Sequence, residues 1–138
     1  MLTKKRQRVS LLKIASIFAI VFLAASCGGA ESVPSDIVRQ YYSAIENEDS
    51  NSAASFFADD AVVVTPSGKV ITGIDEIKGA FIPYDLQNMD RVEFITDFTE
   101  SNGKLSWSQT YHEVNGFTFT SDCEITLENG KTFKWTFQ

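Results

Sequence analysis

The sequence predicts an α+β fold, in which three helices are followed by an antiparallel sheet, from two patterns along the chain. Apolar residues recur at helical spacing between residues 34 and 82, interrupted by one short β-branched hairpin. From Asp90 onward apolar and polar residues alternate, and "SNG", "NG" and "ENG" separate the alternating runs. Because such turns join neighbouring antiparallel strands, we expect a meander in the second half of the chain.

The first predicted helix covers "PSDIVRQYYSAIENED", residues 34–49. Ser35 is a suitable N-cap because its side-chain oxygen can accept a hydrogen bond from a free backbone N–H. Asp36 lies near the positive end of the helix dipole, which stabilises an acid there. The apolar residues recur at helical spacing and predict one buried face: Ile37, Val38, Tyr41, Tyr42 and Ile45.

A shorter helix is expected over "DSNSAASFF", residues 49–57, with Asp49 or Ser50 as its cap. Its inward residues are expected to be Ala53, Phe56 and Phe57. Asp59 and Asp60 follow this helix, at an end where the helix dipole disfavours anions. We therefore interpret the acid pair as a solvent-exposed turn and not as a catalytic apparatus.

A hairpin and a third helix complete the first half of the domain. "AVVV", residues 61–64, and "VIT", residues 70–72, are typical of strands, and "PSGK" between them is typical of a turn. "GIDEIKGAFI", residues 73–82, predicts the third helix.

The strands of the meander are apolar on one face and polar on the other. The residues expected to face inward are Leu105, Trp107, Tyr111, Phe117, Phe119, Cys123, Ile125, Leu127, Phe133, Trp135 and Phe137. Those expected to face outward are Ser106, Ser108, Thr110, His112, Thr118, Thr120, Asp122, Glu124, Thr126, Glu128, Thr132, Lys134 and Thr136. One face of the sheet should therefore pack on the helices, while the other meets solvent or a partner.

Residues 1–26 have the pattern of a signal peptide. Five basic residues precede the first acid, Glu31, and residues 14–25 form an apolar core that is shorter than the roughly 20 residues of a membrane-spanning helix. The segment "LAASC" resembles the lipobox of bacterial lipoproteins, in which the Cys, here Cys27, is lipidated and becomes the new N-terminus. An uncleaved anchor, or ordinary secretion with cleavage nearby, is the alternative.

Lipidation of Cys27 would decide where the protein resides. The two or three acyl chains of a mature bacterial lipoprotein should anchor it stably, because even one myristoyl chain binds a membrane measurably. We therefore expect a protein of the bacterial cell envelope, lipid-anchored to a membrane and facing the extracytoplasmic side. Residues 27–33 would be the tether, and residues 34–138 are expected to form one domain.

Charge and cysteine content exclude several classes of function. Removing the signal segment leaves seven basic against eighteen acidic residues, a net charge of −11. Such a chain is poorly suited to nucleic acid, whose binding depends on basic side chains. With Cys27 lipidated, Cys123 is the only other cysteine, so no intramolecular disulfide is expected. One His and one spare Cys also make a zinc site improbable, and we expect no metal and no cofactor.

The segments "IVRQYYSAIENED", "FFADDAVVVTPSG" and "TGIDEIKGAF" resemble the nuclear transport factor 2-like superfamily, which includes ketosteroid isomerases and SnoaL-like polyketide cyclases. The resemblance covers residues 35–137, and its first half is the specific part. It implies a cone, in which a curved sheet wraps around the helices and leaves an apolar pocket at the open end. It also implies that a homodimer through the sheet is possible.

The isomerases within this superfamily offer a residue-by-residue test, because they use an Asp base and an oxyanion hole of Tyr and a protonated Asp. Laid on their first helix, Tyr41 matches the oxyanion Tyr, but the position of the base is Thr65. Thr has no acid pKa suited to this role. The second acid falls on Cys123, or on Asp122 or Glu124 if the preceding loop is shifted. Since those two acids should face outward, the isomerase activity is not expected.

The same resemblance suggests which residues line the pocket. The candidates are Tyr41, Phe57, Val63, Thr65, Trp107, Tyr111, Cys123 and Trp135. Each has a simpler role as well: the aromatic residues as ordinary core, and Cys123 as a buried thiol without a basic neighbour to lower its pKa.

Two functions therefore stay open. The favoured one is a membrane-anchored, non-catalytic module that binds a small apolar ligand in the pocket or a protein partner through the sheet. The alternative is a SnoaL-like or dehydratase/isomerase-type enzyme, acting on a small hydrophobic substrate, whose acid and base have moved, for example to Asp97, Glu113 or His112. The fold alone does not choose between them.

Overall fold

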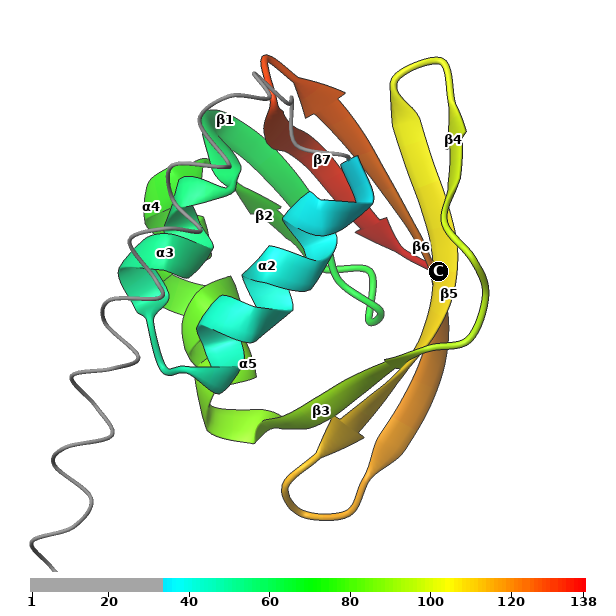
Figure 1. Ribbon diagram of the computed structural model, residues 1–138. Coiled ribbons are helices and arrows are strands. Elements are labelled where there is room, and N and C mark those ends of the chain that lie inside the picture. Colours follow the sequence, from blue (N-terminus) through cyan, green and yellow to red (C-terminus); the bar gives the residue numbers. More distant parts are fainter. Residues whose placement is uncertain (1–33) are drawn as a thin grey trace, which may run out of the picture. The chain divides into compact units, whose positions relative to one another are not determined.

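The computed structural model describes residues 34–138. These residues form one compact unit with a hydrophobic core of its own, which is what a segment needs in order to fold independently. The expected signal peptide, the tether and Cys27 lie outside the described residues. The α+β fold class is confirmed: helices pack on the concave side of a curved sheet (Figure 1).

The first two helices form where the sequence predicts them but end earlier, so that Phe57, expected on the second helix, lies in the strand that follows it. Helix α2 spans Pro34–Glu46 and buries the expected apolar face. Helix α3 spans Ser50–Ser55, and its N-cap is Asp49, whose carboxylate accepts hydrogen bonds from Ser52 N at 3.0 Å and Ser52 Oγ at 2.6 Å. The cap satisfies a backbone donor that would otherwise be free.

The third helical segment is longer than predicted. It runs through α4 (Ile74–Glu76), the π-helical turn η2 (Ile77–Phe81) and α5 (Ile82–Asn88). A proline inside a regular α-helix removes a hydrogen bond and clashes with the carbonyl four residues earlier, so a helix is expected to stop near Pro83. The wider π turn directly before Pro83 makes room for the ring, and the helix continues.

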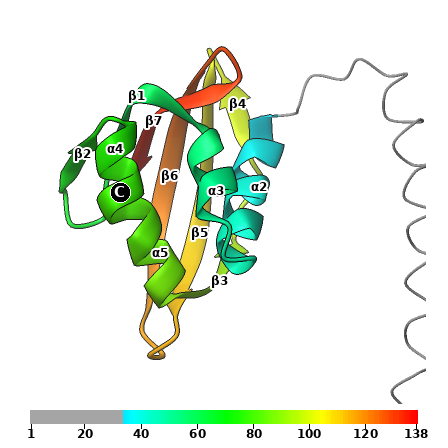
Figure 2. The same cartoon turned by 90° about the vertical axis from the view of Figure 1, so that its left-hand side faces the viewer.

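The described strands form one sheet in the order β2-β1-β7-β6-β5-β3, with β4 pairing with β5. The strands are β1 (Phe57–Val64), β2 (Val70–Thr72), β3 (Met89–Phe94), β4 (Thr99–Ser101), β5 (Lys104–Glu113), β6 (Thr118–Glu128) and β7 (Lys131–Phe137). The meander is antiparallel as predicted, but β1 joins β7 in parallel, so the sheet is mixed. Figure 2 shows the helices lying against one side of this sheet.

The interpretation of Asp59 and Asp60 as a turn is wrong. Both lie within β1, which begins four residues earlier than "AVVV" at Phe57. The two acids are nevertheless exposed, because the pairing of β1 with β7 is irregular between Phe57 and Val62. The irregularity lets a strand carry two adjacent charges into water without turning the chain.

The predicted inward face of the meander is largely confirmed, with exceptions at the two ends of β6. Leu105, Trp107, Tyr111, Cys123, Ile125, Trp135 and Phe137 are buried. The register of β6 and β7 shifts between Thr126 and Leu127, and Thr132 is buried to 1% exposure where Phe133 was expected. Phe117 is 58% exposed because it lies in the turn just before β6 begins.

The centre of the core is aromatic. The ring of Trp135 lies within 6.0 Å, centroid to centroid, of six other aromatic rings: Tyr41, Tyr42, Phe57, Phe81, Trp107 and Phe137. Such pairs stabilise a fold by about 0.5–1.5 kcal/mol each beyond the burial of their area. This cluster fixes α2 and η2 against β1, β5 and β7.

Candidate functional site

A cavity of about 640 Å³ lies between the helical segment η2–α5, the β1–β2 turn and the inner face of the sheet. Its lining consists of Tyr42, Thr65, Pro66, Ser67, Lys69, Ile71, Ala80, Phe81, Tyr84, Asp85, Tyr111, Glu113, Phe117, Phe119, Thr120, Ser121, Phe137 and Gln138. Most of this surface is aromatic or aliphatic, and the polar groups are few. A mainly apolar hollow with a small number of placed polar groups is the usual form of a small-molecule site.

Asp85 is the central polar group of this cavity. It lies on α5 and is only 4% exposed. Tyr41 OH donates a hydrogen bond to Asp85 Oδ2 at 2.7 Å, and Tyr111 OH donates one to Oδ1 at 2.9 Å. Two phenols from opposite sides, one on α2 and one on β5, therefore hold the carboxyl group in place.

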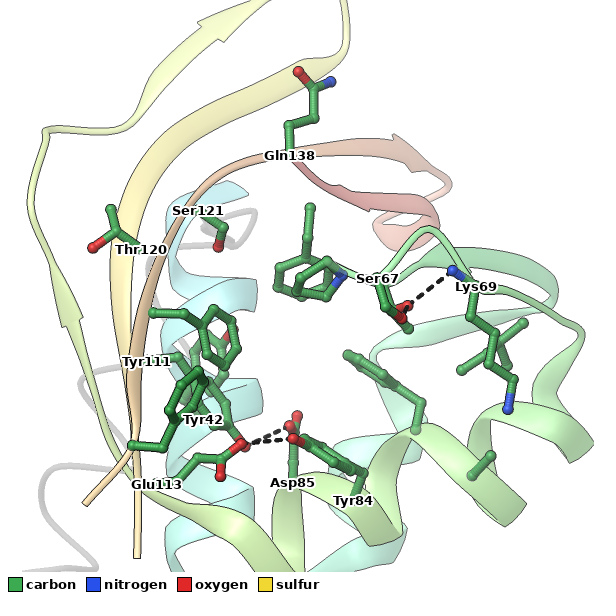
Figure 3. Close-up of a pocket in the computed structure, with 18 residues that line it drawn as sticks. Tyr42, Ser67, Lys69, Tyr84, Asp85, Tyr111, Glu113, Thr120, Ser121 and Gln138 are labelled. Carbon is green, nitrogen blue, oxygen red and sulfur yellow. Dashed lines mark hydrogen bonds between the residues drawn. The ribbon is translucent and has the colours of Figure 1, made fainter. Parts of the chain in front are cut away.

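A second acid–phenol pair crosses the same gap. Tyr84 OH, next to Asp85 on α5, donates a hydrogen bond to Glu113 Oε1 at 2.6 Å. Glu113 is two residues beyond Tyr111 on β5, so both side chains face the cavity. Figure 3 shows these four residues gathered at one end of the cavity, with Thr120, Ser121 and Gln138 further along the sheet.

Burial has the largest effect on the pKa values of Asp85 and the two tyrosines bound to it. Burial raises the pKa of Asp85 to about 6, although the hydrogen bonds from Tyr41 and Tyr111 act in the opposite direction. The pKa of Tyr41 and that of Tyr111 are raised, first by burial and then by the neighbouring Asp85 charge. The phenols therefore stay protonated donors, whereas the carboxyl group changes charge close to neutral pH.

A buried amide holds the wall beside this pair. Gln109 is fully buried; its Oε1 accepts a hydrogen bond from Trp107 Nε1 at 2.8 Å, and its Nε2 donates one to Tyr42 OH at 2.8 Å. Both polar atoms of the Gln109 amide are hydrogen-bonded, so this side chain links Trp107 in the core to Tyr42 in the cavity wall. The side chain of Tyr42, which lines the cavity, is thereby fixed in orientation.

The predicted pocket residues divide between the cavity and the core. Thr65 and Tyr111 line the cavity. Tyr41, Phe57, Val63 and Trp135 are buried in the core cluster, and none of these four is part of the lining. Trp107 and Cys123 are buried beside a second hollow of about 430 Å³ on the other side of β5 and β6.

Thr65 and Cys123 lack the chemistry of a base or nucleophile. Thr65 Oγ1 accepts a hydrogen bond from Lys69 N at 3.1 Å and shares another with Ser67 Oγ at 3.0 Å, which stabilises the β1–β2 turn. Burial raises the pKa of the Cys123 thiol to about 12. This thiol is therefore protonated at neutral pH and weakly nucleophilic.

Of the three positions considered for a relocated acid or base, only Glu113 lines the large cavity. His112 lies on the opposite face of the sheet, where its Nε2 is 3.4 Å from Glu93 Oε2 without forming a hydrogen bond. Asp97 is exposed and borders the second hollow.

Asp85 was missed by the sequence reasoning because the third helix was expected to end before Pro83. The signal was nonetheless present: Ile77, Phe81, Ile82, Asp85 and Met89 follow helical spacing and are all buried. An acid in the middle of an apolar helix face is unusual, since a buried carboxyl needs partners. That position would have identified the site if the helix had been continued through the proline.

Residues 34–138 show neither a metal-binding cluster nor a membrane-spanning helix. No group of three or more His, Cys, Asp or Glu side chains is placed to hold a metal ion within this range. None of the helices described is long and apolar enough to cross a bilayer.

Sequence comparison identifies the family. The model of the nuclear transport factor 2 (NTF2) domain matches residues 33–104. The chain therefore belongs to the NTF2 family, in agreement with its fold. No curated protein sequence matches the chain significantly.

Solved structures share this fold at low sequence identity. A putative polyketide cyclase from Sinorhizobium meliloti has a TM-score of 0.65 at 22% identity, covering 75% of this chain and 94% of its own. An NTF2-like protein of unknown function from Burkholderia pseudomallei has a TM-score of 0.59 at 22% identity, covering 78% and 91%. A protein from Catenulispora acidiphila with a ketosteroid isomerase-like fold, in complex with trimethylamine, has a TM-score of 0.62 at 17% identity, covering 74% and 83%.

Proposed function

We propose that this protein is a membrane-anchored lipoprotein whose NTF2-like domain binds a small, mainly apolar molecule in the cavity between α5 and the sheet. The observation that supports this proposal is the cavity itself, which has a volume of about 640 Å³ and is lined by aromatic side chains and by polar groups. This volume lies within the range of roughly 300–1,000 Å³ that is typical of small-molecule sites. A structural relative solved in complex with trimethylamine supports the use of this fold to bind small molecules.

The binding part of the proposal is tested with N-phenyl-1-naphthylamine, a neutral apolar dye that fluoresces when it leaves water. Ala80 lines the cavity, so Ala80→Phe should fill part of it, while Gln87→Phe on the exposed side of α5 is the matched control. We expect saturable binding of one dye per domain, weakened about tenfold or more by Ala80→Phe and unchanged by Gln87→Phe. Absence of saturable binding, or equal binding by all three proteins, would contradict the proposal.

The anchoring part depends on Cys27, on the "LAASC" motif. Metabolic labelling of a bacterial host with a clickable fatty acid should label the wild-type chain and leave Cys27→Ala unlabelled. The variant should also leave the membrane fraction, provided its signal segment is still cleaved. Equal labelling of both chains would contradict lipidation at this cysteine.

An enzyme is the second candidate, and Asp85 is the observation that favours it. A carboxyl group with a pKa of about 6, held by two phenol donors beside an apolar cavity, has the protonation behaviour of a general acid or base near neutral pH. Such an enzyme would be of the SnoaL-like or dehydratase/isomerase type, acting on a small hydrophobic substrate. Exchange of cyclohexanone α-protons with deuterium from solvent, followed by NMR, provides a simple test. Exchange catalysed by the wild type and lost in Asp85→Asn would favour the enzyme, and no acceleration by the wild type would argue against it.

A further inference from the structure

We propose that the molecule bound in this cavity carries a positively charged nitrogen on its apolar body, and that Asp85 and Glu113 recognise this charge. The inference builds on the proposed function, because it names the ligand class of the same cavity. Two features support it: the negative charge at one end of the cavity is not balanced by a basic side chain, and aromatic faces lie beside it.

Asp85 and Glu113 place two carboxyl groups at the same end of the cavity. The two hydrogen bonds between α5 and β5, Tyr111 to Asp85 and Tyr84 to Glu113, bring them together there (Figure 3). Asp85 is nearly fully buried, and Glu113 lies at the edge of the cavity beside the β5–β6 turn. A ligand that enters this end meets both acids.

Neither acid is balanced by a basic side chain within residues 34–138. The ion pairs in this range are Arg91–Asp90 and Lys104–Glu124, and both lie elsewhere, as does the contact between His112 and Glu93. The side-chain donors to Asp85 are the phenols of Tyr41 and Tyr111, and those to Glu113 are the phenol of Tyr84 and the amide of Asn115. All four donors are neutral, so the negative charge of these acids is hydrogen-bonded but not compensated.

Lys69 is the only basic residue in the lining, and it does not change this conclusion. It is exposed on the β1–β2 turn, and its recorded hydrogen bond to Thr65 is made by the backbone N–H. Figure 3 shows Lys69 across the cavity from Glu113.

Each carboxylate has room for a further donor. An ionised carboxylate offers about four lone-pair sites, and Asp85 uses one on each oxygen for Tyr41 and Tyr111. An ammonium group could therefore bind Asp85 without displacing either phenol. Burial makes such an ion pair stronger than it would be in water, provided the charges are well placed.

The adjacent wall suits a cation as well as an apolar body. The rings of Tyr111 and Phe119 are stacked at 5.0 Å, and Phe117 follows at 6.1 Å from Phe119. Phe117 is 58% exposed, so an aromatic face is presented to solvent near the acids. Aromatic faces attract ammonium groups through their negative quadrupole.

Other ligand charges fit less well. An anionic ligand group would be repelled by the ionised carboxylates of Asp85 and Glu113, because like charges disfavour each other. A purely hydrocarbon ligand would leave the buried Asp85 charge unbalanced, which is unfavourable in a water-poor cavity. A cation satisfies the acids and the aromatic wall together.

The test compares three soluble probes of similar size and different charge: 2-phenylethylammonium, 2-phenylethanol and 3-phenylpropanoate. They are titrated at pH 7.5 into the domain comprising residues 32–138, and binding is followed by NMR shifts of the backbone amides. The same titrations use Asp85→Asn and Glu113→Gln, which keep the shape of each side chain and remove its charge. Asp60→Asn, an exposed acid outside the cavity lining, is the control for loss of one negative charge.

We expect the ammonium probe to bind about tenfold or more tightly than the alcohol, and the carboxylate to bind most weakly. Asp85→Asn should reduce the preference for ammonium over alcohol to about threefold or less, Glu113→Gln should reduce it partly, and Asp60→Asn should leave it unchanged. Equal or tighter binding of the alcohol by the wild type would overturn the cation preference and leave the proposed binding function standing. A preference kept in both cavity variants would overturn the assignment to these acids. If none of the three probes binds while N-phenyl-1-naphthylamine does, this inference fails and the proposed function stands; if the dye does not bind either, both fail.

Discussion

Trp107 and Tyr111 lie four residues apart on the same face of β5, and their surroundings differ sharply. Trp107 is packed against Trp135 and Phe98, and its indole N–H is satisfied by the buried Gln109. Tyr111 lines the cavity and donates its hydroxyl hydrogen bond to Asp85. One strand therefore provides a filled core at one end and an open, polar site at the other.

The difference comes from what covers the strand. The core end is closed by the cluster of aromatic rings around Trp135. The cavity end is covered by α5, which contributes Asp85 in place of an apolar residue. The packed rings are thus gathered around Trp135 and the polar groups able to bind or react around Asp85, while Tyr42, Phe81 and Phe137 belong to both the cluster and the cavity wall.

The largest effect is expected at the core end. Trp135→Ala removes the central ring of the aromatic cluster and should lower the free energy of unfolding by about 3–5 kcal/mol. Urea unfolding followed by circular dichroism measures this. A loss below about 1 kcal/mol would show that Trp135 is not the centre of the core.

A pH-dependent effect is expected from Asp85. The pKa of this carboxyl is about 6 in the folded protein against an ordinary 3.8, so the folded state binds the proton more tightly than the unfolded state does. Its contribution to stability is therefore greatest below about pH 4 and is lost as the pH rises through 6. Ionisation should cost about 3 kcal/mol. Because Asn does not titrate, the stability of Asp85→Asn relative to wild type should increase by about that amount between pH 4 and pH 7.

Parallel urea unfolding of the two proteins at several pH values measures this difference. Other titrating groups affect both proteins alike, so they cancel in the comparison. A stability difference that stays constant from pH 4 to pH 7 would contradict the raised pKa of Asp85.

A smaller stability effect is expected in the cavity wall. Phe119 is only partly buried and stacks on Tyr111, so Phe119→Ala should lower the free energy of unfolding by about 1 kcal/mol. The same substitution should weaken N-phenyl-1-naphthylamine binding several-fold, because it removes part of the apolar wall. Loss of stability comparable to Trp135→Ala, with unchanged dye binding, would place Phe119 in the core and not in the site.

The smallest effect is expected on the outer face of the sheet. His112 Nε2 lies 3.4 Å from Glu93 Oε2 there without forming a hydrogen bond, and Glu93 is largely exposed, so this contact should contribute little to stability. His112→Ala should change stability by less than about 1 kcal/mol and leave dye binding unaltered. Loss of binding in this variant would mean that the outer face participates in the site.

The fold could be predicted from the sequence because its signals are local and agree with one another. The apolar spacing around Tyr41, the cap at Asp49 and the alternation through Trp107 each point to the observed element. No local sequence signal predicts the parallel pairing of β1 with β7, because the two strands are far apart in the chain. The same applies to the bulge that buries Thr132, because an extra residue shifts the alternation without altering composition.

The site was predicted only in part. Thr65 and Tyr111, which line the cavity, were named through the family resemblance, and Tyr111 also lies on the inward face that the alternation predicts. Gln109 and Ser121 are buried on the same face, but polar residues within an apolar alternation were not recognised as inward. Asp85 was not predicted, because Pro83 normally ends a helix; here the π turn before it lets the helix continue.

That π turn also bears on how the domain tolerates changes in chain length. A π-helical turn holds one more residue than the α-helical turn it replaces, and Lys78, Gly79 and Ala80 within it are exposed. Deleting Gly79 should therefore restore a regular α-helix and keep Asp85 in phase with the cavity. A second deletion would find no surplus residue to absorb it, and would rotate α5 by about 100°, turning the acid away from its phenols. The position of Asp85 should therefore tolerate the deletion of one residue from this turn, but not the deletion of two.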